Sequence, residues 1–186
     1  METRRKGPYQ VLSSRNVYKN RWFSVREDGI IRPGGMKDHI GVIEMKAGSS
    51  VLALTDKDEV YLVKEYKYGI ERNSIEAMSG ALEENETPLE AAKRELKEEL
   101  GLEATEWIEL GVVDPFTTAV RSPNYMFLAM GVKEGENNPE EGELLEVVRV
   151  PLSEAVDMAM RSEITHSASC VLILKSDKYL REKRGT

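Results

Sequence analysis

The chain has 186 residues, of which 40% are hydrophobic, and a formal net charge of −7. Its length suits one domain, or one domain with a small appendage, and its acidic balance argues against nucleic acid as the main partner, because such binders carry a basic face. We expect a cytoplasmic protein that does not enter a membrane, because the sequence has no apolar run of about 18 residues and no signal-peptide pattern at its start.

Short strands separated by turn residues fill the first part of the chain. The residue pattern predicts strands at residues 9–18, 22–26, 40–45, 51–54, 60–66 and 74–78. We interpret Asp28-Gly29, Pro33-Gly34-Gly35 and Gly48-Ser49-Ser50 as turns between them. Asp56-Lys57-Asp58 is interpreted as the turn of a hairpin.

The next element is a helix with clear signals at both ends. Thr87 is a favourable N-cap, Pro88 suits the first helical position, and Glu90 completes a capping box. Gly101 ends the helix as a left-handed cap residue. The apolar stripe expected to pack against the rest of the protein comprises Leu89, Ala92, Leu96 and Leu100.

Strands and helices alternate irregularly in the last part of the chain. Strands are predicted near 107–113, 125–131 and 145–150. A helix follows from about 152 to 161, and another starts around 165–167 and continues toward Lys183. Because there is no regular βαβ alternation, the pattern favours a mixed α+β sandwich over a doubly wound sheet.

Three glutamates of the helix after Thr87 have spacings that place them on one face: Glu95, Glu98 and Glu99. Two like charges about 4 Å apart cost roughly 1 to 4 kcal/mol, depending on their exposure to water. A cation would remove this cost. All-oxygen ligands suit Mg²⁺ or Mn²⁺ better than zinc, so the sequence predicts a site for one of these ions.

Two further residues are expected to shape this site. Gly80 permits a backbone path that brings its own carbonyl toward the acids. Arg94 is four residues from both Glu90 and Glu98, so it is placed to pair with either and to orient a carboxylate. A solvated acidic helix is the simpler interpretation of such a charge run, but here the cap, the glycine, the arginine and the acids coincide.

Together these residues form a spaced motif. It reads Gly80-x5-Glu86-x7-Arg94-Glu95-Leu96-x-Glu98-Glu99-x-Gly101-Leu102. The motif resembles the signature of the Nudix hydrolases at every specified position. The resemblance implies a Nudix-type α/β/α sandwich with a mixed β-sheet and a small N-terminal β extension. It also implies a pyrophosphohydrolase in which Glu95, Glu98, Glu99 and the Gly80 carbonyl hold Mg²⁺, or Mn²⁺, and a bound water attacks phosphorus.

Two other segments resemble the branch of this family that includes ADP-ribose and nucleotide-sugar pyrophosphatases. They are Tyr61-Leu62-Val63-Lys64-Glu65-Tyr66-Lys67-Tyr68 and Glu76-Ala77-Met78-Ser79-Gly80. In that branch a segment like residues 1–46, too small for a core of its own, forms an extra sheet that helps to build a homodimer. The resemblance therefore implies a dimerisation segment at 1–46, a catalytic domain at 47–186, and a small-molecule nucleotide substrate, ADP-ribose or a nucleotide sugar.

The chain departs from this branch at two places. Lys67 stands where an arginine is usual, which replaces a bidentate phosphate fork by a point charge. The loop 114–124 lacks the usual Pro-Gly pair, and it lacks the acidic residue that serves as a catalytic glutamate in ADP-ribose hydrolases of this type. The candidates for the general base are then a signature carboxylate that is not fully engaged by metal, or Glu143.

Candidates for substrate recognition are cations, which hold phosphates, and aromatic residues, which stack on rings. They are Arg32, Lys67, Tyr68, Arg121 and Tyr125, although such residues are more often packed or solvated. Cys170 lies in an apolar run and is interpreted as a core residue. His39 and His166 have no ligand-like neighbour in the sequence and are assigned no chemistry.

Other functions on the same fold stay open as alternatives. A catalytically inactive nucleotide-binding or regulatory module would be expected to lack a signature acid or arginine, and this sequence lacks none. An isoprenoid-diphosphate isomerase would need a reactive cysteine in its pocket, whereas Cys170 falls in a late apolar helix. Hydrolysis of coenzyme A, a dinucleoside polyphosphate or a nucleoside triphosphate is a further alternative, and a capped RNA is disfavoured by the charge.

Overall fold

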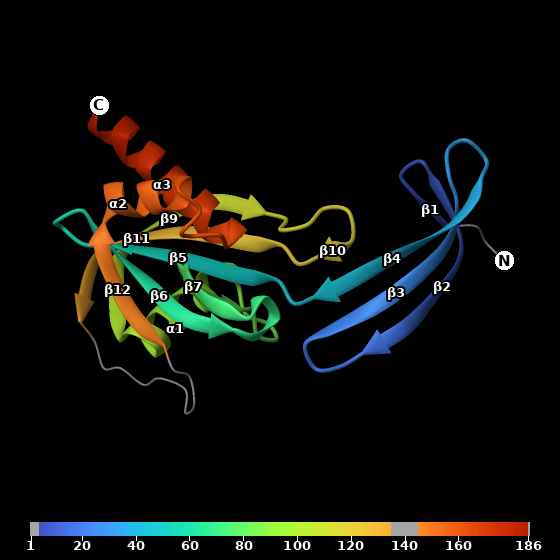
Figure 1. Ribbon diagram of the computed structural model, residues 1–186, viewed down its shortest axis with the longest axis horizontal. Coiled ribbons are helices and arrows are strands. Elements are labelled where there is room, and N and C mark those ends of the chain that lie inside the picture. The colour runs from blue at the N-terminus through green and yellow to red at the C-terminus, as the bar shows by residue number, and fades with distance from the viewer. Residues whose placement is uncertain (1–3, 135–144, 186) are drawn as a thin grey trace. The chain divides into compact units, whose positions relative to one another are not determined.

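The structure, a computed structural model, describes residues 4–134 and 145–185, and the chain divides into two compact units (Figure 1). Unit 1 comprises Met1–Lys46 and Asp114–Pro123, and unit 2 comprises Ala47–Val113 and Asn124–Thr186. Unit 1 therefore includes a loop, 114–123, that a division at residue 46 assigns to the second domain.

Within the described residues, unit 1 forms a five-stranded sheet in the order β1-β2-β3-β4-β10. Its strands are β1 (Arg4–Lys6), β2 (Tyr9–Lys19), β3 (Phe23–Ile31), β4 (Lys37–Met45) and β10 (Val120–Arg121). The first four are antiparallel neighbours, whereas β10 lies parallel to the end of β4. The three predicted strands of this region are present, and β3 runs on to Ile31, past its predicted end at Arg26.

Asp28-Gly29 lies inside β3, so the prediction of a turn at these residues is wrong. Asp28 is 4% exposed and accepts hydrogen bonds from Lys6 Nζ at 2.8 Å, Ser14 Oγ at 2.5 Å and Arg26 Nε at 3.0 Å. Burial raises the pKa of Asp28, but these hydrogen bonds and the two positive charges outweigh it and lower the pKa below its ordinary value. A charge network that joins three strands thus overrides the local turn preference.

In the described part of unit 2 the strands form a seven-stranded sheet, β12-β6-β5-β11-β9, with β7 paired to β6 and β8 to β5. They are β5 (Gly48–Leu54), β6 (Glu59–Lys67), β7 (Arg72–Glu76), β8 (Met78–Ala81), β9 (Leu102–Val113), β11 (Asn124–Glu134) and β12 (Glu146–Pro151). β5 and β6 pair next to their hairpin, which confirms the predicted turn. Further along, β7 and β8 pair with the facing edges of β6 and β5, so the β7–β8 segment lies between these strands.

Helix α1 (Pro88–Leu100) covers one face of this sheet, and α2 (Leu152–Met160) and α3 (Ser167–Arg184) cover the other (Figure 1). A short 3₁₀ turn, η1 (Tyr68–Ile70), joins β6 to β7. Alternate residues of β5 point to opposite layers: Val51 and Ala53 pack in the α1 core, whereas Leu52 and Leu54 pack in the core under α2 and α3. The result is an α/β/α sandwich, as predicted.

Strand β5 begins at Gly48, so the predicted turn Gly48-Ser49-Ser50 is wrong. Ser49 and Ser50 are both 0% exposed, and Ser49 lies opposite Gly80 of β8. The Ser49 hydroxyl donates a hydrogen bond to the carbonyl of Pro88 at 3.0 Å, which ties the strand to the start of α1. Pairing with a strand thirty residues later in the chain outweighs the local turn preference of these small residues.

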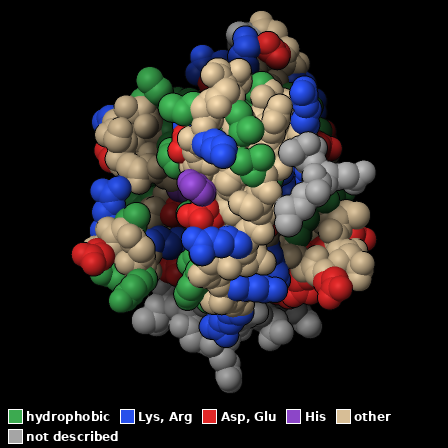
Figure 2. All heavy atoms as spheres, turned by 90° about the vertical axis from the view of Figure 1, so that its right-hand side faces the viewer, with side chains coloured by type: hydrophobic (Ala, Val, Ile, Leu, Met, Phe, Trp, Pro, Cys, Tyr) green, Lys and Arg blue, Asp and Glu red, His purple; other side chains and the backbone are tan. Residues whose placement is uncertain are grey.

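Figure 2 shows one face of the molecule, on which basic, acidic and hydrophobic side chains are interspersed. In unit 1, exposed large hydrophobic side chains include Val17, Tyr18, Trp22 and Met36. Among the described residues, no helix combines the length and the apolar character needed to span a membrane.

Candidate active site

Helix α1 begins and ends as the sequence predicts. The Thr87 hydroxyl accepts a hydrogen bond from the Glu90 N–H at 3.3 Å, and the Glu90 carboxylate accepts one from the Thr87 N–H at 2.8 Å, which closes the capping box. Gly101 ends the helix in the left-handed region with a φ of 61°. Strand β9 then starts at Leu102, earlier than the strand predicted near Trp107.

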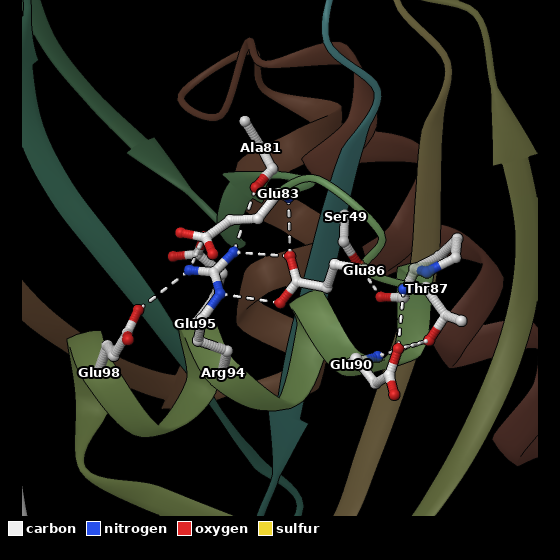
Figure 3. Close-up of polar contacts among 10 residues, drawn as sticks. Ser49, Ala81, Glu83, Glu86, Thr87, Glu90, Arg94, Glu95 and Glu98 are labelled. Atoms are coloured by element: carbon white, nitrogen blue, oxygen red, sulfur yellow. Dashed lines mark hydrogen bonds and ion pairs between the residues drawn. The ribbon is translucent and has the colours of Figure 1, made fainter.

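The guanidinium of Arg94 joins the carboxylates of the motif (Figure 3). Its Nε and Nη2 donate to the two oxygens of Glu86 at 2.9 and 3.1 Å. Its Nη1 donates to Glu95 Oε1 at 2.8 Å and to Glu98 Oε2 at 3.0 Å. Of the two predicted partners of Arg94, Glu98 is confirmed, whereas the hydrogen bonds of Glu90 go to the N-cap. The arginine is therefore an orienting residue for three acids.

This pairing changes the acid strengths of the groups. The hydrogen bonds from Arg94 hold the pKa of Glu86 below its ordinary value, and the bond to Glu86 raises the pKa of Arg94. The pKa of Glu95 is raised, mainly by burial and further by the charges of Glu98 and Glu86, which Arg94 offsets only in part. The Glu95 side chain is 12% exposed and that of Glu98 38%. A bound cation would therefore stabilise the charged form of Glu95.

Position 80 requires a glycine because there is no space for a side chain; its backbone conformation would not exclude other residues. It lies in the extended strand β8. A Cβ at this position would overlap the carboxylate of Glu95. The next residue, Ala81, turns its carbonyl toward Arg94 and accepts a hydrogen bond from Nη2 at 3.2 Å. The glycine thus makes a recess in which the Glu95 carboxylate lies against the strand.

The donors on this face fit a hard divalent cation, because they are carboxylate and carbonyl oxygens. Glu95 and Glu98 already share one positively charged nitrogen, and the Glu95 carboxylate occupies the space that the absent side chain of Gly80 leaves. Among residues 4–134 and 145–185, no three His, Cys, Asp or Glu side chains are grouped closely enough to hold a metal ion. In this arrangement two of the acids point to Arg94, so holding an ion would require glutamate side chains on α1 to rotate.

Two of the predicted substrate-binding residues lie where β6 ends and η1 begins. Lys67 ends β6, with its Nζ 2.5 Å from Glu65 Oε2. Burial lowers the pKa of Lys67, but the bond to Glu65 and the charges of Glu76 and Glu99 outweigh it, so the pKa is raised. The charge of a signature acid, Glu99, therefore acts on the ammonium group. Tyr68 follows in η1 and is 91% exposed.

Of the other predicted residues, one lies in unit 2, two lie in unit 1, and one is outside the described residues. Tyr125 lines a pocket of about 360 Å³ with two other aromatic side chains, beside the start of α1. Arg32 and Arg121 belong to unit 1, where Arg32 pairs with an aspartate of the same unit at 2.6 Å. Glu143 lies outside the described residues.

One cluster beside the site was not foreseen, and it includes a histidine to which the sequence assigned no chemistry. The Nδ1 atom of His166 lies 3.4 Å from Glu76 Oε2 and 2.8 Å from the hydroxyl of Ser169. The available signal was Glu76, an ionisable residue between Ile75 and Ala77 in the middle of a predicted strand. Its partners come from a helix almost a hundred residues later, so spacing could not have identified them.

Comparison with known families decides what this arrangement is. The NUDIX domain family matches residues 45–169, which is most of the chain, and the nucleoside diphosphate sugar hydrolase N-terminal domain family matches residues 9–38. The chain belongs to the Nudix family. This confirms the resemblance drawn from the motif, and with it the expectation of a Nudix hydrolase, an enzyme that acts on phosphorus-containing anhydrides.

Three relatives match this Nudix chain over most of their length. The ADP-ribose pyrophosphatase of Bacillus subtilis is 25% identical over 184 residues, covering 95% of this chain and 94% of the relative. That of Mycobacterium tuberculosis is 28% identical over 170 residues, covering 89% and 82%. The methanol dehydrogenase activator of Bacillus methanolicus is 23% identical over 169 residues, covering 88% and 90%.

A solved structure supports the fold of this Nudix chain. The crystal structure of an ADP compounds hydrolase superposes with a TM-score of 0.83 at 22% identity, and the match covers 94% of this chain and 95% of that one. The predicted Nudix-type α/β/α sandwich is thereby confirmed.

We predict that Arg94→Gln lowers the free energy of unfolding by about 2 kcal/mol at pH 7 without added metal, because it leaves three acids without their shared cation. Since Arg94 lowers the pKa of Glu86, this part of its contribution is present above the ordinary glutamate pKa of 4.5 and is lost as the pH falls through the lowered value. The difference between variant and wild type should therefore shrink toward pH 3, as measured by denaturant titration. Arg161→Gln, which removes a solvent-exposed arginine that also pairs with two glutamates, is the control and should have little effect.

Proposed function

We propose that this Nudix enzyme is a magnesium-dependent pyrophosphohydrolase that cleaves the diphosphate bond of a nucleoside diphosphate linked to another group, with ADP-ribose or a nucleotide sugar as substrate. The observation that carries the proposal is that Glu95 and Glu98 both bind the guanidinium of Arg94, next to the recess at Gly80. The substrate class is supported by the names of the two ADP-ribose pyrophosphatases and of the family that matches residues 9–38.

In this proposal Glu95, Glu98, Glu99 and the carbonyl of Gly80 would hold Mg²⁺, with Mn²⁺ as a substitute. When bound, the ion neutralises the diphosphate and lowers the pKa of an attacking water. The Glu95 side chain lies in the recess of β8, and Arg94 gathers Glu95 and Glu98 at one place on α1. To hold the ion, these side chains would rotate away from Arg94.

The remaining residues of the proposal bind substrate and move a proton. The Lys67 ammonium stays charged, because its pKa is raised, and it would donate hydrogen bonds to a phosphate oxygen. A signature carboxylate oxygen that is not engaged by metal would accept the proton of the attacking water, with Glu143 as the alternative. Tyr68 and Tyr125 would stack on rings of the substrate.

We further propose that the protein is a homodimer built through unit 1, in which Arg32 and Arg121 serve the substrate. Trp22 is 64% exposed, Tyr18 53% and Val17 48%, so this unit presents apolar surface that a second copy could cover. Sedimentation equilibrium should give twice the monomer mass of 21.0 kDa, and Trp22→Ser should weaken the association. A monomer at micromolar concentration would contradict this part of the proposal.

Glu98→Gln should reduce Mg²⁺-dependent turnover by about tenfold to a hundredfold with the fold intact, because an ion ligand is lost and no packing changes. Initial rates and circular dichroism measure the two effects. Glu103→Gln is the matched control: this exposed acid follows the same helix, pairs with Lys97 at 2.9 Å, and should leave turnover unchanged. Normal turnover in Glu98→Gln would remove the support for the site.

A substrate panel tests the specificity. We expect ADP-ribose or a nucleotide sugar (GDP-mannose, UDP-glucose) to give the highest kcat/KM, measured as phosphate released after a phosphatase step. Coenzyme A, diadenosine polyphosphates and nucleoside triphosphates complete the panel. A preference for one of these would reject the proposed substrate class and retain the hydrolase. No hydrolysis of any of them with Mg²⁺ or Mn²⁺ would favour the inactive regulatory module.

A further inference from the structure

A pocket of about 360 Å³ is lined by the start of α1 and by strands β9 and β11. Its walls are residues 87–89 of the helix region and three aromatic side chains, Trp107, Tyr125 and Phe127. The rings of Trp107 and Phe127 meet edge to face, with centroids 6.5 Å apart, and the indole N–H donates to the Ala104 carbonyl at 3.2 Å. These walls are therefore already fixed before a ligand binds, and they suit a planar ring.

Among the described residues, one charged side chain lines this pocket, the carboxylate of Glu109 on β9. It is exposed and forms no hydrogen bond or ion pair with any other described residue. The hydroxyl of Thr87, which also lines the pocket, is already engaged by Glu90 in the capping box. Glu109 therefore offers a ligand an acceptor with two oxygens.

Two features favour a neutral ring with N–H donors over an organic cation. The Nζ atom of Lys93 lies 6.0 Å from the centroid of the Trp107 ring, so a positive charge already lies over this wall. The start of α1, beside the same pocket, carries the positive end of the helix dipole. Both charges would repel a cation, and neither repels a neutral ring.

The pattern of donors on the ring selects among the nucleobases. A carboxylate is best matched by two adjacent N–H donors, as in its bidentate pairing with arginine. Guanine has such a pair on one edge, the N1–H and the 2-amino group. Adenine presents its amino group beside a nitrogen that only accepts, and uracil presents its N–H between two carbonyl oxygens, so each would place an acceptor against Glu109.

We propose that this pocket binds a guanine ring, which lies against Trp107 and Tyr125 and donates its N1–H and 2-amino hydrogens to the carboxylate of Glu109. Leu89 in the pocket wall is six residues before Glu95, about 9 Å along the helix axis. This distance allows the ring to belong to the substrate, in which case the inference rests on the proposed function and narrows it to guanine nucleotides. The other source is a separate guanine nucleotide.

The fluorescence of Trp107 measures binding in the pocket without hydrolysis. The chain has two tryptophans, so Trp22→Phe leaves Trp107 as the reporter. Nucleosides are the probes, because they have no phosphate that could bind at the acidic face. We expect saturable quenching by guanosine, about tenfold weaker binding of inosine, which lacks the 2-amino group, and weaker binding still of uridine.

Three further variants in this background test the assigned contacts. Glu109→Gln should weaken guanosine binding about tenfold and remove the preference for guanosine over inosine, because an amide offers a single acceptor oxygen. Glu106→Gln is the matched control: this exposed acid of the same strand pairs with Lys183 at 3.1 Å and should retain both. Tyr125→Leu should weaken all three nucleosides alike, because stacking is lost and the carboxylate stays.

Competition identifies the source of the ring. If the ring belongs to the substrate, guanosine raises the apparent KM for GDP-mannose, and Glu109→Gln weakens this competition; if it belongs to a separate nucleotide, guanosine saturates the pocket without competing. Absence of saturable quenching, equal affinity for guanosine and uridine, or unchanged guanosine binding in Glu109→Gln would overturn the inference. If guanosine binds as expected and the enzyme hydrolyses nothing in the panel, the proposed function fails and the guanine site stands.

Discussion

Like charges gathered on one helix face need a compensating charge, and in this protein the guanidinium of Arg94 supplies it. Its planar fork engages Glu86 with two nitrogens and leaves the third for Glu95 and Glu98. A lysine could not do this, because a single ammonium cannot hold three carboxylates in defined rotamers. The recess at Gly80 serves the same interaction, because it holds the carboxylate of Glu95, which also binds Arg94.

The elements that the sequence predicts correctly are those with local signals. Helix α1 has its capping box at Thr87 and its left-handed Gly101 within one stretch of chain, so each boundary can be read from neighbouring residues. The acidic face follows from helical spacing, and the family follows from the motif. The pairing of Arg94 with Glu98 was visible for the same reason, whereas its fork onto Glu86 depends on how the preceding loop folds.

The errors fall where distant residues decide the structure. Asp28-Gly29 and Gly48-Ser49-Ser50 have the composition of turns, yet both lie in strands, because one is bound by charges from neighbouring strands and the other pairs with β8. His166 had no signal at all, since its partner Glu76 lies ninety residues earlier in the chain. Local preference is weak compared with burial and pairing, so it fails at sites that are built from several elements.

The β7–β8 segment touches both helical layers within a few residues. The N–H of Ala77 donates a hydrogen bond to Ser169 of α3, and three positions later Gly80 makes room for Glu95 of α1. The β7–β8 segment therefore contacts the helices on both faces of the sheet. A graft of the glutamate-rich helix and its glycine onto another scaffold would also need the distant serine, because without it the Ala77 N–H between the two strands would lose its hydrogen-bond partner.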